Sequence, residues 1–131
     1  MRLLLVRHPP PVTDGPVCYG RLDVAVDESE LRETARRVRM QLPPVDGDGV
    51  EIWSSPAQRC RALAELLAAG SPVRHSDDLR EIDFGAWEGR RWADIPREQL
   101  DAWALDVWNY RVGEGESARM VERRWLRWLT R

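Results

Sequence analysis

The chain has 131 residues, enough for one domain, and 43% of them are hydrophobic, which suffices for a buried core. Its 20 basic and 22 acidic residues leave a formal net charge of −2, so charge gives no case for binding nucleic acid or an anionic membrane surface. The two cysteines lack metal-type spacing and are too few for a disulfide framework, which predicts a cytoplasmic protein. The N-terminal apolar run is too short for a signal peptide or a membrane span.

Short apolar runs and segments of helical periodicity alternate along the chain. Three strands are predicted, over residues 2–7, 50–53 and 73–76. Four helices are predicted to begin near Asp27, Ser55, Pro96 and Ser117. Irregular segments separate these elements, over residues 9–27, 43–49, 79–95 and 113–115. The order of elements favours a largely parallel α/β sheet in a single domain spanning 1–131.

Arg7 and His8 stand at the end of the first predicted strand, and the chain has one other histidine, His75. The carboxyl ends of parallel strands form the crevice in which α/β sheets bind ligands. A histidine beside an arginine suits a phosphoryl site there, because one group attacks and the other holds the anion. An isolated Arg-His pair is more often a core or surface dipeptide, so this prediction depends on two later segments.

The first of these segments, Ser54–Cys60, directly follows the second predicted strand. It places Arg59 beside a helix N-terminus, where free N–H groups favour anions; the alternative is a solvated helix residue. The second segment, Leu79–Gly89, combines carboxylic acids, glycines and aromatic residues, which indicates a shaped pocket. Glu81 could donate a proton to a leaving alkoxide there. The alternative is that its acidic residues hold the loop, and Glu88 is predicted to be structural.

Together these segments resemble the histidine phosphatase superfamily, which has the phosphoglycerate-mutase-like fold. Three segments match its motifs in order and spacing: Arg7-His8, Ser54–Cys60 and Leu79–Gly89. Two more segments, Cys18–Asp23 and Gly115–Ser117, resemble family loops near the site. The Trp87-Glu88-Gly89 version is most similar to the α-ribazole-phosphate phosphatase branch, which is associated with cobalamin biosynthesis. The resemblance extends from Met1 to about Ser117.

The resemblance implies a three-layer αβα sandwich and phosphomonoester hydrolysis through a phosphohistidine intermediate. His8 would be the nucleophile, and Glu81 would protonate the leaving oxygen. Arg7 and Arg59 would bind the phosphoryl oxygens. The substrate would also contact Tyr19, Gly20 and Trp87. No metal or cofactor is implied, because arginine and histidine donors neutralise the charge. The expected partner is a small phosphorylated metabolite.

Two departures from the family pattern affect the prediction. Pro9 stands where the family usually has glycine, and proline lacks an N–H donor. The family also has a second histidine, in a His-Gly pair at the end of a later strand. His75 cannot replace it, because it lies ahead of the Glu81 segment. Since the family's later strand lies between the first and second strands, we expect a domain that is incomplete at its C-terminal side, with reduced or absent activity.

Three alternatives follow from these departures. One is a degenerate relative that binds phosphate ligands without turnover. Another is a mutase that acts on phosphoglycerates, which the resemblance favours less. A homodimer or a swapped element could also cover the sheet edges and the apolar surface near Trp125 and Trp128.

Overall fold

The centre of the fold is a β–α–β unit. Strands β1 (Ile52–Ser54) and β2 (Val73–His75) pair in parallel, with Ile52 opposite Val73. Helix α2 (Gln58–Ala68) connects them and packs on both strands. The predicted parallel α/β arrangement is therefore confirmed, with a sheet of two strands. The structure is a computed structural model that describes residues 2–43 and 49–131, so most of the turn predicted over 43–49 lies outside it.

Three further helices complete the fold: α1 (Glu28–Arg39), α3 (Arg97–Leu105) and α4 (Ala118–Leu129). Short 3₁₀ turns lie between them: η1 (Asp77–Leu79), η2 (Gly85–Trp87), η3 (Trp92–Asp94) and η4 (Val112–Glu114). The predicted caps at Asp27 and Ser117 are confirmed, because each side chain accepts a hydrogen bond from a first-turn N–H.

Helix α2 begins later than predicted. Its N-cap is Ala57, which has no side-chain cap, and the helix starts at Gln58 rather than at Ser55. The Gln58 N–H donates instead to the Asp23 carboxylate, 2.9 Å away. The capping group thus comes from a loop 35 residues upstream, which local sequence signals do not report.

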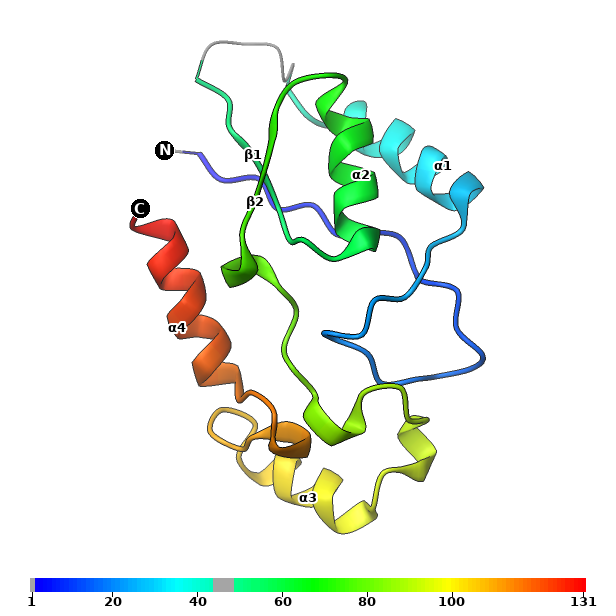
Figure 1. Cartoon of the computed structure of the whole chain (residues 1–131), viewed down its shortest axis with the longest axis vertical. Helices are drawn as coiled ribbons and strands as arrows, with labels where there is room; N and C mark the ends of the chain where they lie inside the picture. Colours follow the sequence, from blue (N-terminus) through cyan, green and yellow to red (C-terminus); the bar gives the residue numbers. More distant parts are fainter. Residues whose placement is uncertain (1, 44–48) are drawn as a thin grey trace.

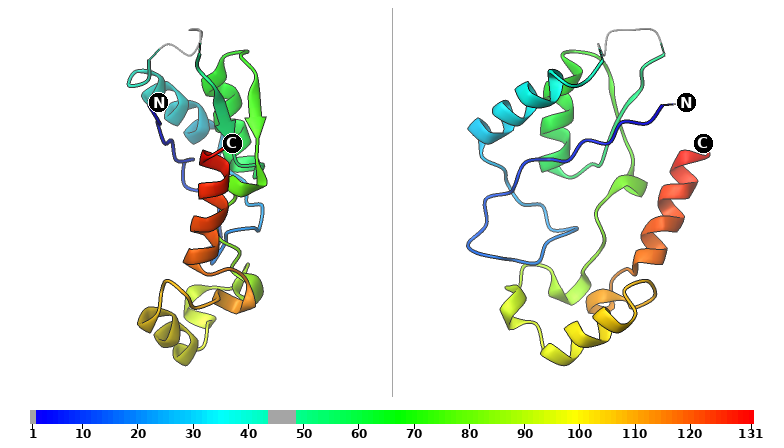
Figure 2. Two further views of the ribbon diagram at one scale, coloured as in Figure 1. Left: turned by 90° about the vertical axis from the view of Figure 1, so that its left-hand side faces the viewer. Right: turned by 180° about the vertical axis from the view of Figure 1, so that it is seen from behind.

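The molecule is elongated and has two separate hydrophobic clusters. At one end, α1 packs against α2 through Leu31, Ala35, Leu63 and Leu67. At the other end, the segment around α3 encloses Cys18, Phe84, Trp87, Ile95 and Val112. Helix α4 runs along one side between these two ends, as Figure 1 shows. The side view in Figure 2 shows that the molecule is thin.

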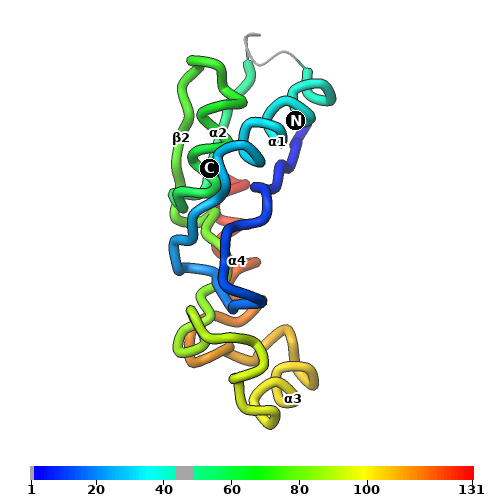
Figure 3. The backbone as a smooth tube through the Cα atoms, turned by 90° about the vertical axis from the view of Figure 1, so that its right-hand side faces the viewer, coloured from blue at the N-terminus to red at the C-terminus, as the bar shows by residue number. Residues whose placement is uncertain are grey.

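The first predicted strand is wrong. Residues 2–7 are extended but belong to no strand, and the side chains of Leu3 to Val6 are 43–69% exposed. An apolar run becomes a buried strand only where partners supply ladder hydrogen bonds on its edges. Within residues 2–43 and 49–131, no segment pairs with this run. Figure 3 shows the N-terminal part of this run beside α1.

None of the helices in the described part of the chain is both long enough and apolar enough to span a membrane.

Candidate active site

His8 and Arg59 meet at the start of α2. The Arg59 Nε–H donates to His8 Nε2 at 3.3 Å. Its other two nitrogens donate to backbone carbonyls, Nη1 to Leu22 at 3.0 Å and Nη2 to Gly20 at 2.7 Å. Only 1% of Arg59 is exposed. The 20–22 loop thus fixes a buried positive charge against the imidazole.

The hydrogen bonds of His8 define its protonation. Its Nδ1 lies 2.7 Å from the carbonyl oxygen of Pro9, and because a carbonyl only accepts, Nδ1 carries the proton. Burial lowers the pKa of His8 below its ordinary value of 6.5, and the charges of Arg59 and Arg7 lower it further. The Pro9 hydrogen bond and the Glu81 carboxylate act in the opposite direction on this pKa. The neutral imidazole therefore keeps a lone pair on Nε2.

Tyr19 and Gly20, expected to contact substrate, both lie against Arg59. The guanidinium carbon lies 5.2 Å from the centre of the Tyr19 ring, a cation–π contact. Gly20 is buried, and a Cβ atom there would lie 1.9 Å from the carbonyl oxygen of Ile82. Only glycine lets the two loops pass this closely. The position of Arg59 thus depends on both residues.

Asp23 ends the Cys18–Asp23 segment, but the sequence assigned it no role of its own. It accepts from the Gln58 N–H and lies 4.0 Å from Arg59 Nη1. The N-terminus of α2 was expected to offer free N–H groups to an anion, but this carboxylate takes the Gln58 N–H. The recognition of an anion at this site therefore depends more on side chains than on the helix terminus.

Glu81 lies within electrostatic reach of His8. Its negative charge raises the pKa of the imidazole, as stated above. The same charge also raises the pKa of the Cys60 thiol, for which burial is the main cause of the increase. The Glu81 side chain is exposed, and its Oε1 accepts from the N–H of Ile82 at 3.0 Å. The charges of Arg7, Arg59 and Glu81 thus all act on the His8 imidazole.

Glu88 organises the loop that holds Arg59. Its two carboxylate oxygens accept four backbone N–H groups at 2.8–3.0 Å, from Gly20, Arg21, Leu22 and Phe84. A single carboxylate therefore joins the 20–22 loop to the segment that follows Glu81. The predicted structural role of Glu88 is confirmed.

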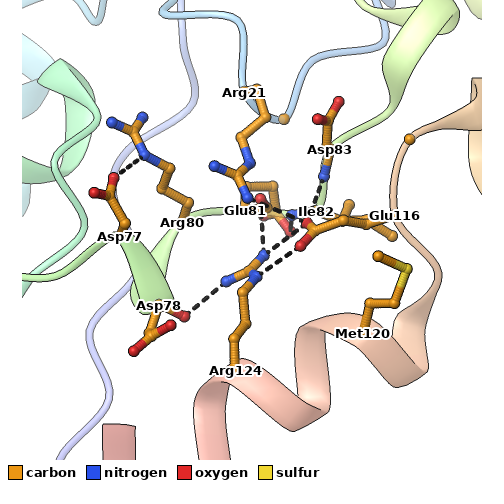
Figure 4. Close-up of polar contacts among 12 residues, drawn as sticks. Arg21, Asp77, Asp78, Arg80, Glu81, Ile82, Asp83, Glu116, Met120 and Arg124 are labelled. Atoms are coloured by element: carbon orange, nitrogen blue, oxygen red, sulfur yellow. Dashed lines mark hydrogen bonds and ion pairs between the residues drawn. The ribbon is translucent and has the colours of Figure 1, made fainter. Parts of the chain in front are cut away.

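Glu116 lies in the Gly115–Ser117 segment and pairs with Arg124, a residue that no sequence motif covered. Arg124 Nε and Nη2 donate to the two Glu116 carboxylate oxygens, both at 3.0 Å, and the Arg124 side chain is 6% exposed (Figure 4). Burial alone would raise the pKa of Glu116, but hydrogen bonds from Arg124 and the Asp83 N–H, together with the Arg124 and Arg21 charges, lower it. One signal was present: Arg124 occupies a position of the apolar α4 stripe, where an arginine needs a buried partner.

Trp87 does not lie where a substrate could reach it. It is 1% exposed, and its Nε1–H donates to Gln99 Oε1 at 2.8 Å. Its ring packs edge-on to Trp92 and Trp103. The predicted substrate contact at Trp87 is therefore corrected: this side chain is part of the core, because an indole buries a large apolar area once its N–H has a partner.

Across residues 2–43 and 49–131, no three histidine, cysteine, aspartate or glutamate side chains are grouped to hold a metal ion.

Comparisons with solved structures give several similar folds. TTHB049 from Thermus thermophilus is 30% identical, with a TM-score of 0.67 over 87% of this chain and 62% of that protein. The α-ribazole phosphatase from Shigella flexneri is 24% identical, with a TM-score of 0.74 over 88% of this chain and 58% of that one. A putative α-ribazole-5'-P phosphatase from Escherichia coli K-12 is 24% identical, with a TM-score of 0.71 over 89% of this chain and 58% of that protein. The chain thus spans about three fifths of the length of these proteins.

A comparison with curated proteins gives no match. The sequence profile of the histidine phosphatase superfamily (branch 1) matches residues 3–131, a range that includes every residue of the site described above. With that match, and with His8 and Arg59 in contact, the chain belongs to the histidine phosphatase superfamily.

Proposed function

We propose that this site hydrolyses phosphomonoesters through a phosphohistidine on His8 Nε2. One observation carries the proposal: a neutral imidazole directs its Nε2 lone pair at a buried guanidinium, 3.3 Å away. That arrangement pairs a nucleophile with a cation that binds the group to be attacked.

The proposed reaction has two steps. His8 Nε2 releases the hydrogen bond from the Arg59 Nε–H and attacks phosphorus, the ester P–O bond breaks, and Glu81, protonated once the anionic substrate is bound, gives its proton to the leaving oxygen. A water molecule then attacks the phosphohistidine and loses a proton to Glu81, the P–N bond breaks, and inorganic phosphate leaves. Arg59 uses three of its five N–H groups on the protein, so two remain for phosphoryl oxygens. Arg7 supplies a second positive charge at the same imidazole.

The substrate class proposed is a small phosphorylated metabolite, with α-ribazole 5'-phosphate as the specific candidate. The structural likeness to two proteins named as α-ribazole phosphatases supports the candidate through the fold, and the Trp87-Glu88-Gly89 segment supports it through sequence. The cytoplasm is the proposed location, which the two free cysteines support.

A second candidate is a phosphate-ligand binder without turnover. It is favoured by one observation: the Nε2 lone pair of His8, which would have to attack phosphorus, accepts a hydrogen bond from the buried Arg59 Nε–H at 3.3 Å. It predicts saturable binding of a phosphate ester with no release of inorganic phosphate.

Trapping the intermediate distinguishes the two candidates. The chain is mixed with p-nitrophenyl phosphate, quenched in alkali, and searched by mass spectrometry for a phosphoryl group on His8. We expect the adduct in the parent chain and in His75→Asn, but not in His8→Asn. Product release that is unchanged in His8→Asn would contradict a phosphohistidine on this residue, and ligand binding without release would favour the binder.

The pH dependence of kcat/KM offers an independent check. His8 attacks only when neutral, and its pKa lies below the ordinary 6.5, so activity should fall on the acid side only below pH 6.5. The His8 pKa is lower in the native state than in the unfolded chain, so the unfolded chain binds this proton at a higher pH. The free energy of unfolding therefore also rises as the pH rises through the range between these two pKa values. An acid limb centred above pH 7 would contradict this assignment of the nucleophile.

A further inference from the structure

The backbone that carries Glu81 has no regular structure of its own. It follows η1, which ends at Leu79, and precedes η2, which begins at Gly85. In this interval no sheet partner or helical turn fixes the peptide groups. A catalytic carboxyl on such a segment needs other contacts to hold its position, because a misplacement of about 1 Å can cost a hundredfold in rate.

Helix α4 supplies those contacts through Arg124. Its Nη1 donates to the carbonyl oxygen of Asp78 at 2.7 Å, and its Nη2 donates to the carbonyl oxygen of Glu81 itself at 3.1 Å. Figure 4 shows the guanidinium reaching from the helix to both points. The planar fork of an arginine presents five N–H donors in fixed directions, which suits acceptors that lie at several separate points.

Glu116 extends the same set of contacts. Its Oε2 accepts from the Asp83 N–H at 3.0 Å, while both of its oxygens bind Arg124. It also pairs with Arg21 at 3.4 Å, in the loop whose carbonyls hold Arg59. The pair thus binds the backbone at Asp78, Glu81 and Asp83, which lie before, at and after the proposed proton donor. Through Arg21 it also contacts the loop that holds Arg59.

We propose that Arg124 and Glu116 form a positioning pair that sets the Glu81 carboxyl relative to His8. The proposal rests on the proposed function for the role of Glu81 as the proton donor. Arg127 provides a natural comparison on the same helix. It is 65% exposed and pairs with the Asp78 side chain at 3.2 Å, whereas Arg124 binds the backbone.

A leaving-group comparison tests the pair. Proton donation matters for an alkoxide and much less for p-nitrophenolate, a stable anion. For Arg124→Met we expect kcat/KM, which reports only the steps up to departure of the alcohol, to fall about 10- to 100-fold on glycerol 1-phosphate and by less than about threefold on p-nitrophenyl phosphate. Glu81→Gln should show the same selectivity more strongly. Arg127→Met should change neither rate, and equal losses on both substrates in Arg124→Met would overturn the proposal.

Loss of a buried ion pair can also unfold the chain, so a second variant separates the effects. The double variant Arg124→Met with Glu116→Gln leaves no uncompensated buried charge and should unfold at a higher denaturant concentration than Arg124→Met alone. It still lacks the contacts to the carbonyls of Asp78 and Glu81, so the leaving-group selectivity should persist. Recovery of the alkyl phosphate rate together with stability would show a purely structural role.

A titration of His8 followed by NMR tests positioning without any turnover. The charged groups that act on His8 are Arg59, Arg7 and Glu81, and of these only Glu81 raises its pKa. If Arg124→Met displaces Glu81, the pKa of His8 falls, because the carboxylate that raises it has moved away. Loss of the Arg124 positive charge, without any movement of Glu81, would raise the pKa of His8 instead. The direction of the shift therefore distinguishes displacement of Glu81 from simple loss of charge.

His75 serves as the internal reference, and Arg127→Met as the control. A fall in the His8 pKa in an otherwise inactive chain would support the positioning pair even if the proposed function failed. An unchanged or raised His8 pKa would overturn the positioning pair whether or not the chain hydrolyses phosphate esters.

Discussion

Replacing Glu88 by alanine is expected to lower the free energy of unfolding by about 4 kcal/mol, because one carboxylate accepts four backbone N–H groups. Each donor left unpaired costs about 1–3 kcal/mol where it is buried, and water can reach the Leu22 N–H. Typical domains are stable by about 5–15 kcal/mol, so this single change would remove much of the total. Urea unfolding followed by tryptophan fluorescence measures the loss.

Glu88→Gln should be nearly as damaging as the alanine variant. The N–H donors are shared evenly, with Arg21 and Phe84 on one oxygen and Gly20 and Leu22 on the other. An amide keeps one oxygen and turns an NH₂ group toward the other two donors.

Glu65→Ala is the matched control for Glu88. Its carboxylate is 59% exposed and lies 3.9 Å from Arg61, so its loss should cost less than about 0.5 kcal/mol. If Glu88→Gln proved as stable as the parent chain, the carboxylate would not be the acceptor that holds the two loops.

The predictions that succeeded depend on signals close in sequence. Asp27 and Ser117 cap their helices through N–H groups two or three residues away, and the pattern of residue types reports such contacts directly. The structure also brings His8 and Arg59 into contact, although the run before His8 is not the strand that was expected to place it, and the catalytic roles of both residues stay a prediction.

The predictions that failed required partners far along the chain. The apolar run over 2–7 has the composition of a buried strand, but composition does not supply the neighbouring strands. Trp87 was assigned to a pocket, since an aromatic residue in a glycine-rich loop fits a core and a binding site equally well. The contact of Arg124 with the Glu81 carbonyl joins residues 43 positions apart, and no local pattern encodes it.

Replacing Arg59 by methionine is expected to have the largest effect on the proposed reaction. The change removes the buried charge beside His8 and leaves the carbonyls of Gly20 and Leu22 without their donor. Losing preorganised charge stabilisation at a phosphoryl group should lower kcat/KM by about a thousandfold or more. Arg59→Lys keeps the charge but cannot reach all three acceptors, so its kcat/KM should lie between that of the parent chain and that of Arg59→Met. Arg61→Met, at a position 52% exposed, is the control and should leave the rate unchanged.

The same variant should change the titration of His8 in a defined direction. Arg59 lowers the pKa of the imidazole, so its removal should raise that pKa toward the ordinary 6.5 and shift the acid limb of kcat/KM upward by the same amount. The NMR titration reads this shift even in a variant too slow to assay. A loss of turnover with an unmoved His8 pKa would mean that Arg59 acts on folding alone, and the pairing of nucleophile and cation on which the proposed function depends would then have to be abandoned.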